Sequence, residues 1–154
     1  MNTATEKFIK DAVDNYSDTV FRVAFQYTKN RRDAEDILQE VFFILVKKRP
    51  QLYGGQLKAW LIRVAINKSK DYLRASSRRA EVRFYEQQPR SRDDYSEVFD
   101  ALGKLPERDR NALYLHYYEG YTAREIAGIL GGTERAVTKR ICRAREKLKN
   151  FLEE

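Results

Sequence analysis

A run of cationic side chains near the end of the chain has the composition that binds phosphate. Between Thr133 and Leu152 the cationic residues are Arg135, Lys139, Arg140, Arg143, Arg145, Lys147 and Lys149, against Glu134 and Glu146. Such a run attracts the backbone of nucleic acid, although a solvated helix face can have the same composition. On one helix, the residues near its start that would reach base edges in a groove are Arg135, Thr138, Lys139, Cys142 and Arg143. We expect Arg140, Arg145 and Lys147 to meet phosphates or solvent instead.

A second polar and basic group lies in the first half of the chain. Arg63, Asn67, Lys70 and Arg74 recur at spacings of four, three and four, so they form one stripe if the helix is continuous. Base and phosphate contacts could share that stripe. The alternative for Asn67 is a helix cap or a surface amide. The nearby Trp60 could stack on an unpaired base, but it also lies on the apolar face, where core packing is expected.

Residues for catalysis or metal binding are scarce. One cysteine and one histidine cannot build a Cys/His zinc site, and Cys142 cannot form an internal disulfide. No nucleophile or paired carboxylate accompanies His116. We therefore expect no enzymatic activity, no catalytic residues, no metal and no cofactor.

The charge of the chain favours a polyanionic partner. It carries 30 Lys and Arg against 23 Asp and Glu, which gives a net charge of +7. No apolar run reaches the roughly 18 residues that a membrane span needs, and residues 1–10 lack the apolar core of a signal peptide. We expect a cytoplasmic protein without membrane insertion.

Hydrophobic periodicity predicts an all-α fold. Three helices are expected in the first half, over 8–27, from about 33 to 49 and from about 57 to 74, with Asn67 leaving open whether the third is one helix or two. Residues 76–95 lose the pattern and read as a linker. The predicted domains are therefore residues 1–76 and 96–154, joined by a linker over 77–95.

The second domain contains the signals of a helix-turn-helix. Thr122 and Glu125 have capping-box spacing ahead of an apolar stretch, Gly131 and Gly132 supply a tight exit, and Thr133 can cap the last helix. In a helix-turn-helix the second helix enters the major groove of DNA.

Several motifs, in order along the chain, resemble those of bacterial RNA polymerase sigma factors of the extracytoplasmic-function (ECF) group. They are DAEDILQEVF from Asp33, AWLIRVAIN from Ala59, LPER from Leu105, REIA from Arg124 and KRICRAR from Lys139. The resemblance extends from Tyr16 to Leu148. One departure is the string Arg135-Ala136-Val137, where the family usually has Gly-Thr-Val, so readout at that point is expected to differ.

The resemblance implies that the first domain docks on the clamp helices of core RNA polymerase and melts the minus-ten element of promoter DNA, while the second domain reads the minus-thirty-five element. By motif, the clamp contacts would be Asp33, Asp36, Gln39 and Glu40, and Asn67 matches the asparagine beside the loop that captures a flipped minus-ten base. The other minus-ten contacts would come from its stripe, Arg63, Lys70 and Arg74. The minus-thirty-five contacts would be Arg135, Thr138, Lys139, Cys142 and Arg143. The acidic residues also complement the helix dipole, and both roles can hold together.

The resemblance further implies control by an anti-sigma protein. The alternative from another class is a stand-alone helix-turn-helix regulator, whose first domain would dimerise or bind a ligand. A regulator of that kind binds duplex operator by itself, whereas a sigma factor gains promoter specificity with core polymerase.

Overall fold

The computed structural model describes residues 3–78 and 96–153. Within these ranges the chain forms seven α-helices and no strand, which confirms the predicted all-α class. By its internal contacts the chain divides into two compact units, Met1–Gln88 and Pro89–Glu154. Apart from residues 77 and 78, the predicted linker over 77–95 lies outside the described residues. None of the helices described is long and apolar enough to span a membrane.

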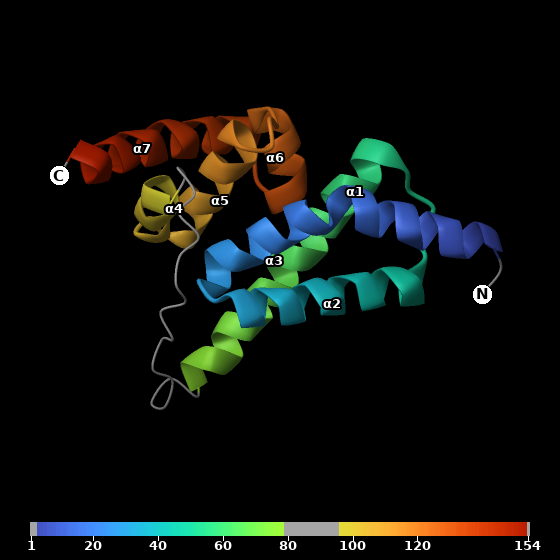
Figure 1. Ribbon diagram of the computed structural model, residues 1–154. Helices are drawn as coiled ribbons and strands as arrows, with labels where there is room; N and C mark the ends of the chain where they lie inside the picture. Colours follow the sequence, from blue (N-terminus) through green and yellow to red (C-terminus); the bar gives the residue numbers. More distant parts are fainter. Residues whose placement is uncertain (1–2, 79–95, 154) are drawn as a thin grey trace. The chain divides into compact units, whose positions relative to one another are not determined.

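Three helices make up the first unit: α1 (Thr3–Thr28), α2 (Arg31–Lys48) and α3 (Gly54–Arg78). Each packs against the other two, as Figure 1 shows. Their apolar stripes meet in a core that includes Val20, Ala24, Val41, Leu45 and Leu61, all fully buried. The Asn30 side chain caps α2 by accepting a hydrogen bond from the Asp33 N–H at 3.2 Å.

Helix α3 is continuous through Asn67. Asparagine inside a helix is tolerated when packing supports its neighbours, and Ala65 and Ile66 beside it are buried. The helix ends at Arg78, so the predicted domain boundary at residue 76 falls inside α3. Because α3 is one continuous helix, the residues of the polar stripe can lie on one of its faces.

Four helices make up the second unit: α4 (Ser96–Gly103), α5 (Glu107–Tyr117), α6 (Ala123–Leu130) and α7 (Glu134–Glu153). Helix α7 contacts α4, α5 and α6, and it is the longest of the four (Figure 1). Its stripe of Val137, Ile141 and Ala144 is buried, as are Leu115 of α5 and Ile126 of α6, two helices that α7 packs against. This packing fixes which sides of α7 face outward.

The turn between α6 and α7 has the predicted local structure. Thr122 and Glu125 form both hydrogen bonds of the capping box. Gly131 and Gly132 have φ values of +89° and +96°, in the region that glycine enters without steric cost. The Thr133 hydroxyl accepts a hydrogen bond from the Ala136 N–H at 3.1 Å and caps α7. The predicted helix-turn-helix elements are thus present.

Candidate nucleic-acid and partner interfaces

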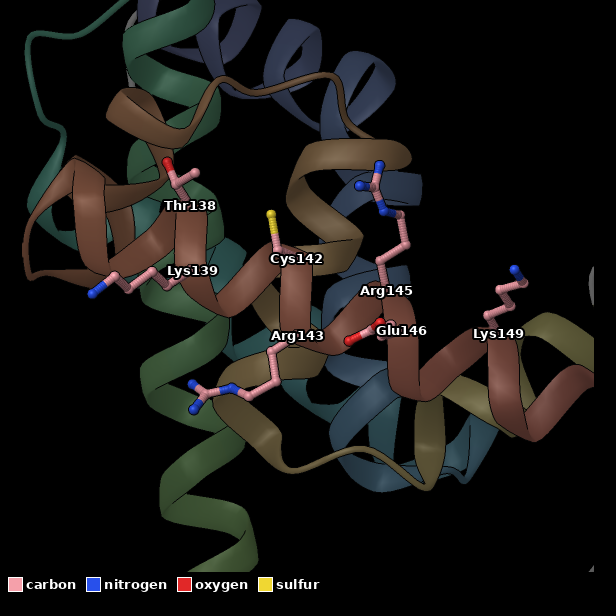
Figure 2. A pocket seen from close by; sticks show the side chains of 7 residues that line it. All are labelled: Thr138, Lys139, Cys142, Arg143, Arg145, Glu146 and Lys149. Atoms are coloured by element: carbon pink, nitrogen blue, oxygen red, sulfur yellow. The ribbon is translucent and has the colours of Figure 1, made fainter.

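The outward side of α7 carries the residues predicted to read base edges. Arg135, Thr138, Lys139, Cys142 and Arg143 are all exposed. Figure 2 shows Thr138 and Cys142 along one side of the helix and Lys139 and Arg143 along the neighbouring side. These residues share one outward face because the buried stripe of α7 occupies the other.

A shallow surface hollow of about 690 Å³ runs along this face (Figure 2). It is lined by Thr138, Lys139, Cys142, Arg143, Arg145, Glu146 and Lys149. Five of these seven side chains are ionic and only Glu146 is anionic, so the hollow favours an anionic partner. The thiol of Cys142 is free.

The hydroxyl of Thr138 is committed to its own helix. Its Oγ1 lies 2.9 Å from the carbonyl oxygen of Glu134, and because a carbonyl can only accept, the threonine hydroxyl donates. What Thr138 can still offer to a partner is therefore its methyl group and the two acceptor lone pairs of its oxygen.

Two of the cationic residues of α7, Arg140 and Lys147, lie near a buried carboxylate of α5, a partner that the sequence did not indicate, and Lys147 keeps 44% of its side chain exposed to solvent. Arg140 Nε lies 3.8 Å from Asp109 Oδ1, and Lys147 Nζ lies 3.6 Å from Asp109 Oδ2. The Asp109 side chain is only 8% exposed. A carboxylate on α5 thus binds two cations of α7, and this pairing depends on tertiary structure that periodicity does not reveal.

Arg145 also has a partner inside the second unit. Its Nη1 donates a hydrogen bond of 2.7 Å to the hydroxyl of Tyr117 at the end of α5. Arg145 remains exposed, so it can still face an anion from this position. The cations of α7 that are exposed and take part in no ion pair within the described residues include Arg135, Lys139 and Arg143.

The predicted stripe on α3 lies on one helix face. Arg63, Asn67 and Arg74 are exposed and Lys70 is half-buried. Arg74 also forms an exposed ion pair with Asp71 at 3.3 Å, a contact that contributes little to stability. None of the four residues is buried in the core, and the side chains of Arg63, Asn67 and Arg74 are exposed to solvent.

The predicted acidic group on α2 divides into two environments. Asp36, Gln39 and Glu40 are exposed, and Glu40 has a loose contact of 3.9 Å with Lys68 of α3. Asp33 is half-buried and accepts a short hydrogen bond from the hydroxyl of Tyr72. Asp33 therefore helps to hold the start of α2 against α3, and its role toward a partner stays a prediction.

Phe43 was missed by sequence reasoning, although it shares the face of Asp36, Gln39 and Glu40. It is 67% exposed. It follows Asp36 by seven positions and Gln39 by four, the spacings of one helix face. A wheel of α2 would have found it, because Val41 and Leu45 lie on the opposite side and are fully buried.

Within the two described ranges, no group of three or more His, Cys, Asp or Glu side chains could hold a metal ion. His116 is engaged locally, with its Nδ1 2.8 Å from the carbonyl oxygen of Tyr121 and its ring against that of Tyr117. The side chain of His116 thus connects the end of α5 to the backbone of the turn that follows it.

Two family models match the chain, one over each unit. The model described as Sigma-70 region 2 matches residues 12–79, and the model described as Sigma-70, region 4 matches residues 95–148. The first match contains most of α1 and all of α2 and α3. The second contains the helix-turn-helix and most of α7.

Two curated relatives are similar over 92% of the chain. The ECF RNA polymerase sigma-E factor of Haemophilus influenzae is 30% identical, and the match covers 85% of its length. The ECF RNA polymerase sigma factor SigE of Mycolicibacterium smegmatis is 28% identical, and the chain spans 60% of that relative. Among solved structures, the sigma factor RpoE of Bartonella quintana, in complex with the anti-sigma factor NepR, shares the fold. Its TM-score is 0.81 at 22% identity, with 96% of this chain and 98% of that one covered.

Proposed function

The chain belongs to the ECF group of sigma-70 factors, and on that premise we propose that it binds core RNA polymerase, directs it to specific promoters and promotes DNA melting. The matched families are transcription initiation factors and not a catalytic family. A stand-alone helix-turn-helix regulator is not favoured, because the first unit matches region 2 of the same family.

The observation that carries the proposal is that one chain contains three charged or polar helix faces. Helix α2 presents an acidic and polar face, α3 presents cations around the Asn67 amide, and α7 presents a cationic face on a helix-turn-helix. A duplex-binding regulator would need the last of these. The other two suit a protein that also docks on a polymerase and contacts separated strands.

For the polymerase contact we assign Asp36, Gln39 and Glu40, together with Asp33 at the edge of the face. The exposed carboxylates complement a basic helical surface on the clamp. Because these charges are exposed, their contribution falls as ionic strength rises. Asp33 is the member of this set that also stabilises the first unit, through its hydrogen bond with Tyr72.

For the minus-ten element we assign Arg63, Asn67, Lys70 and Arg74. Melting without ATP requires that exposed bases be held by hydrogen bonds, stacking and backbone charge, with about 1–3 kcal/mol per stacked base. The Asn67 amide offers a donor and an acceptor to a base edge that pairing no longer occupies. The cations on either side along the stripe would hold the phosphates of that strand.

For the minus-thirty-five element we assign Arg135, Thr138, Lys139, Cys142 and Arg143. They face outward from α7, while Arg140 and Lys147 are held by Asp109. The proposed partners are thus core polymerase, duplex promoter DNA and the melted non-template strand, and the proposed place of action is the cytoplasm. We also propose regulation by an anti-sigma protein, since the structurally similar RpoE was crystallised with one.

One electrophoretic mobility experiment tests the function. A promoter fragment is mixed with the chain alone, with core polymerase alone and with both, and opening is followed by permanganate reactivity of unpaired thymines. We expect a promoter-specific, permanganate-reactive complex only with both. Tight, specific binding of duplex by the chain alone, without association with core, would instead support the regulator.

A charge-reversal pair sharpens the test of docking. Asp36→Lys should weaken association with core, whereas Asp14→Lys makes the same change of net charge at an exposed position of α1 and should not. Equal loss in the two variants would point to bulk charge and contradict the assignment of this face.

A further inference from the structure

The exposed ring of Phe43 lies on the outward face of α2, in the C-terminal half of the helix. Its side chain is 67% exposed, while Ile37, Val41 and Leu45 on the opposite side are buried. The core of the first unit is therefore complete without it. An exposed phenylalanine also has a lower helix propensity than alanine, so local stability does not call for one here.

The other exposed aromatic side chains in the described residues each have a contact within the fold. Tyr53 packs edge-on against Phe8, Tyr117 against His116, and Tyr118 stacks on Tyr114. No ring contact of this kind is seen for Phe43 in residues 3–78 and 96–153. A single exposed apolar residue is ordinary on a protein surface, so the neighbours of Phe43 carry the argument.

Those neighbours are polar and carry both signs of charge. Gln39 and Glu40 precede Phe43 by four and three positions and Asp36 by seven, so they border the ring on its N-terminal side, and the exposed Lys47 follows it by four positions on the same face. An apolar aromatic centre with a polar rim is the arrangement of a binding hot spot, in which the rim excludes water from the central anchor. On this rim the carboxylates of Asp36 and Glu40 outnumber the one cation, Lys47, and they lie together on the N-terminal side, where they favour a basic partner surface.

We propose that Phe43 is the apolar anchor of the α2 face, inserting into an apolar depression beside cationic side chains on the core polymerase. The inference rests on the proposed function and names the residue that makes the main apolar contact of this face. Asp36 and Glu40 then contribute orientation and association rate more than affinity.

The test measures the Kd of fluorescently labelled core polymerase for the full chain and its variants. Phe43→Ala should raise the Kd about 30-fold, the size of a hot-spot truncation. Tyr53→Ala removes an equally large and even more exposed ring, 72% exposed, from a position off this face, and should change the Kd less than about two-fold. Phe43→Leu keeps apolar volume and should recover most of the affinity.

Salt dependence separates the anchor from its rim. The ratio of Kd values between Phe43→Ala and the unchanged chain should stay constant between low and high salt, because apolar burial is not screened. The defect of Asp36→Lys should shrink as salt rises. Circular dichroism should show equal helicity and melting temperature for Phe43→Ala and the unchanged chain, because the ring is exposed.

The outcomes distinguish this inference from the proposed function. If the unchanged chain does not bind core, the proposed function fails. If the unchanged chain binds and Phe43→Ala binds equally well, or if Tyr53→Ala is weakened as much, the anchor is overturned and the function stands. A Phe43→Leu variant as weak as Phe43→Ala would also overturn it.

Discussion

Replacing Asp109 with asparagine removes the charge that holds α7 to α5 and leaves the shape of the side chain nearly unchanged. Asp109 lies in the first turn of α5, where a negative charge also suits the helix dipole. Its two oxygens lie 3.8 Å from Arg140 and 3.6 Å from Lys147. The substitution therefore removes two ion pairs and one dipole interaction together.

The expected loss is about 2 kcal/mol in the free energy of unfolding of the second unit. At an effective dielectric constant of about 20, each ion pair at these distances is worth ~4 kcal/mol before the cost of desolvating the carboxylate. Removing one partner of a buried pair costs about 3–5 kcal/mol when the other charge is stranded. Here Arg140 is 21% and Lys147 44% exposed, so both can turn to water and the loss is smaller.

Amide hydrogen exchange on the full chain measures this loss. A loss of about 2 kcal/mol should accelerate exchange of the slowest amides of α5 and α7 about 30-fold. Amides of α1, α2 and α3 serve as an internal control, as does the fluorescence of Trp60, the single tryptophan, which lies in α3. Glu146→Gln removes the same charge from an exposed position of α7 and should change exchange less than about three-fold.

DNA binding gives an independent readout. Arg140 and Lys147, once released, can neutralise up to two further phosphates, so the slope of log K against log salt for non-specific duplex should steepen by up to about 1.8. Exchange in α7 that matches the unchanged chain would refute the reasoning that the buried carboxylate holds this helix. So would an identical effect from Glu146→Gln.

Three further predictions concern the other faces. Lys139→Ala should weaken binding to upstream duplex and reduce the slope of log K against log salt by about 0.9. The prediction is wrong if altering the upstream promoter element leaves runoff transcription unaffected in both the variant and the unchanged chain. Asn67→Ala should impair open-complex formation while core binding persists, and unchanged permanganate reactivity would count against it. The hydrogen bonds from the Thr122 backbone N–H and side chain lower the pKa of Glu125 below 4.5. The stability that the ionised Glu125 carboxylate contributes is therefore complete above that pH and is lost as the pH falls through the lowered value. Glu125→Gln should reduce the dependence of the melting temperature on pH in this acidic range. If the melting temperatures of the variant and the unchanged chain vary with pH in parallel, the role of the Glu125 charge is disproved.

Local signals predicted the helices well because each depends on residues within about four positions. The caps at Thr122 and Thr133, the tight exit at Gly131, and the buried stripe of α7 all have this range, and the structure contains each of them. The fold class follows from such signals, since apolar periods of three to four recur along most of the chain.

Contacts between distant residues could not be predicted in the same way. The cations of α7 look equivalent along the sequence, and only packing against α5 brings Arg140 and Lys147 to Asp109. The hydrogen bond between Tyr72 and Asp33 likewise joins helices far apart in sequence. Asn67 was ambiguous for another reason: asparagine suits both a cap and a surface position, and only the surrounding packing decides.

In the proposed contact with DNA, the committed hydroxyl of Thr138 limits which base atoms this side chain can bind. With its hydrogen directed to the Glu134 carbonyl, the side chain has no proton to give to the N7 or O6 of guanine. It can receive one from the exocyclic amine of adenine or cytosine, or lay its methyl against that of thymine. If Thr138 contacts bases as proposed, this bond internal to the helix disfavours a contact with guanine N7 or O6 at this point of α7.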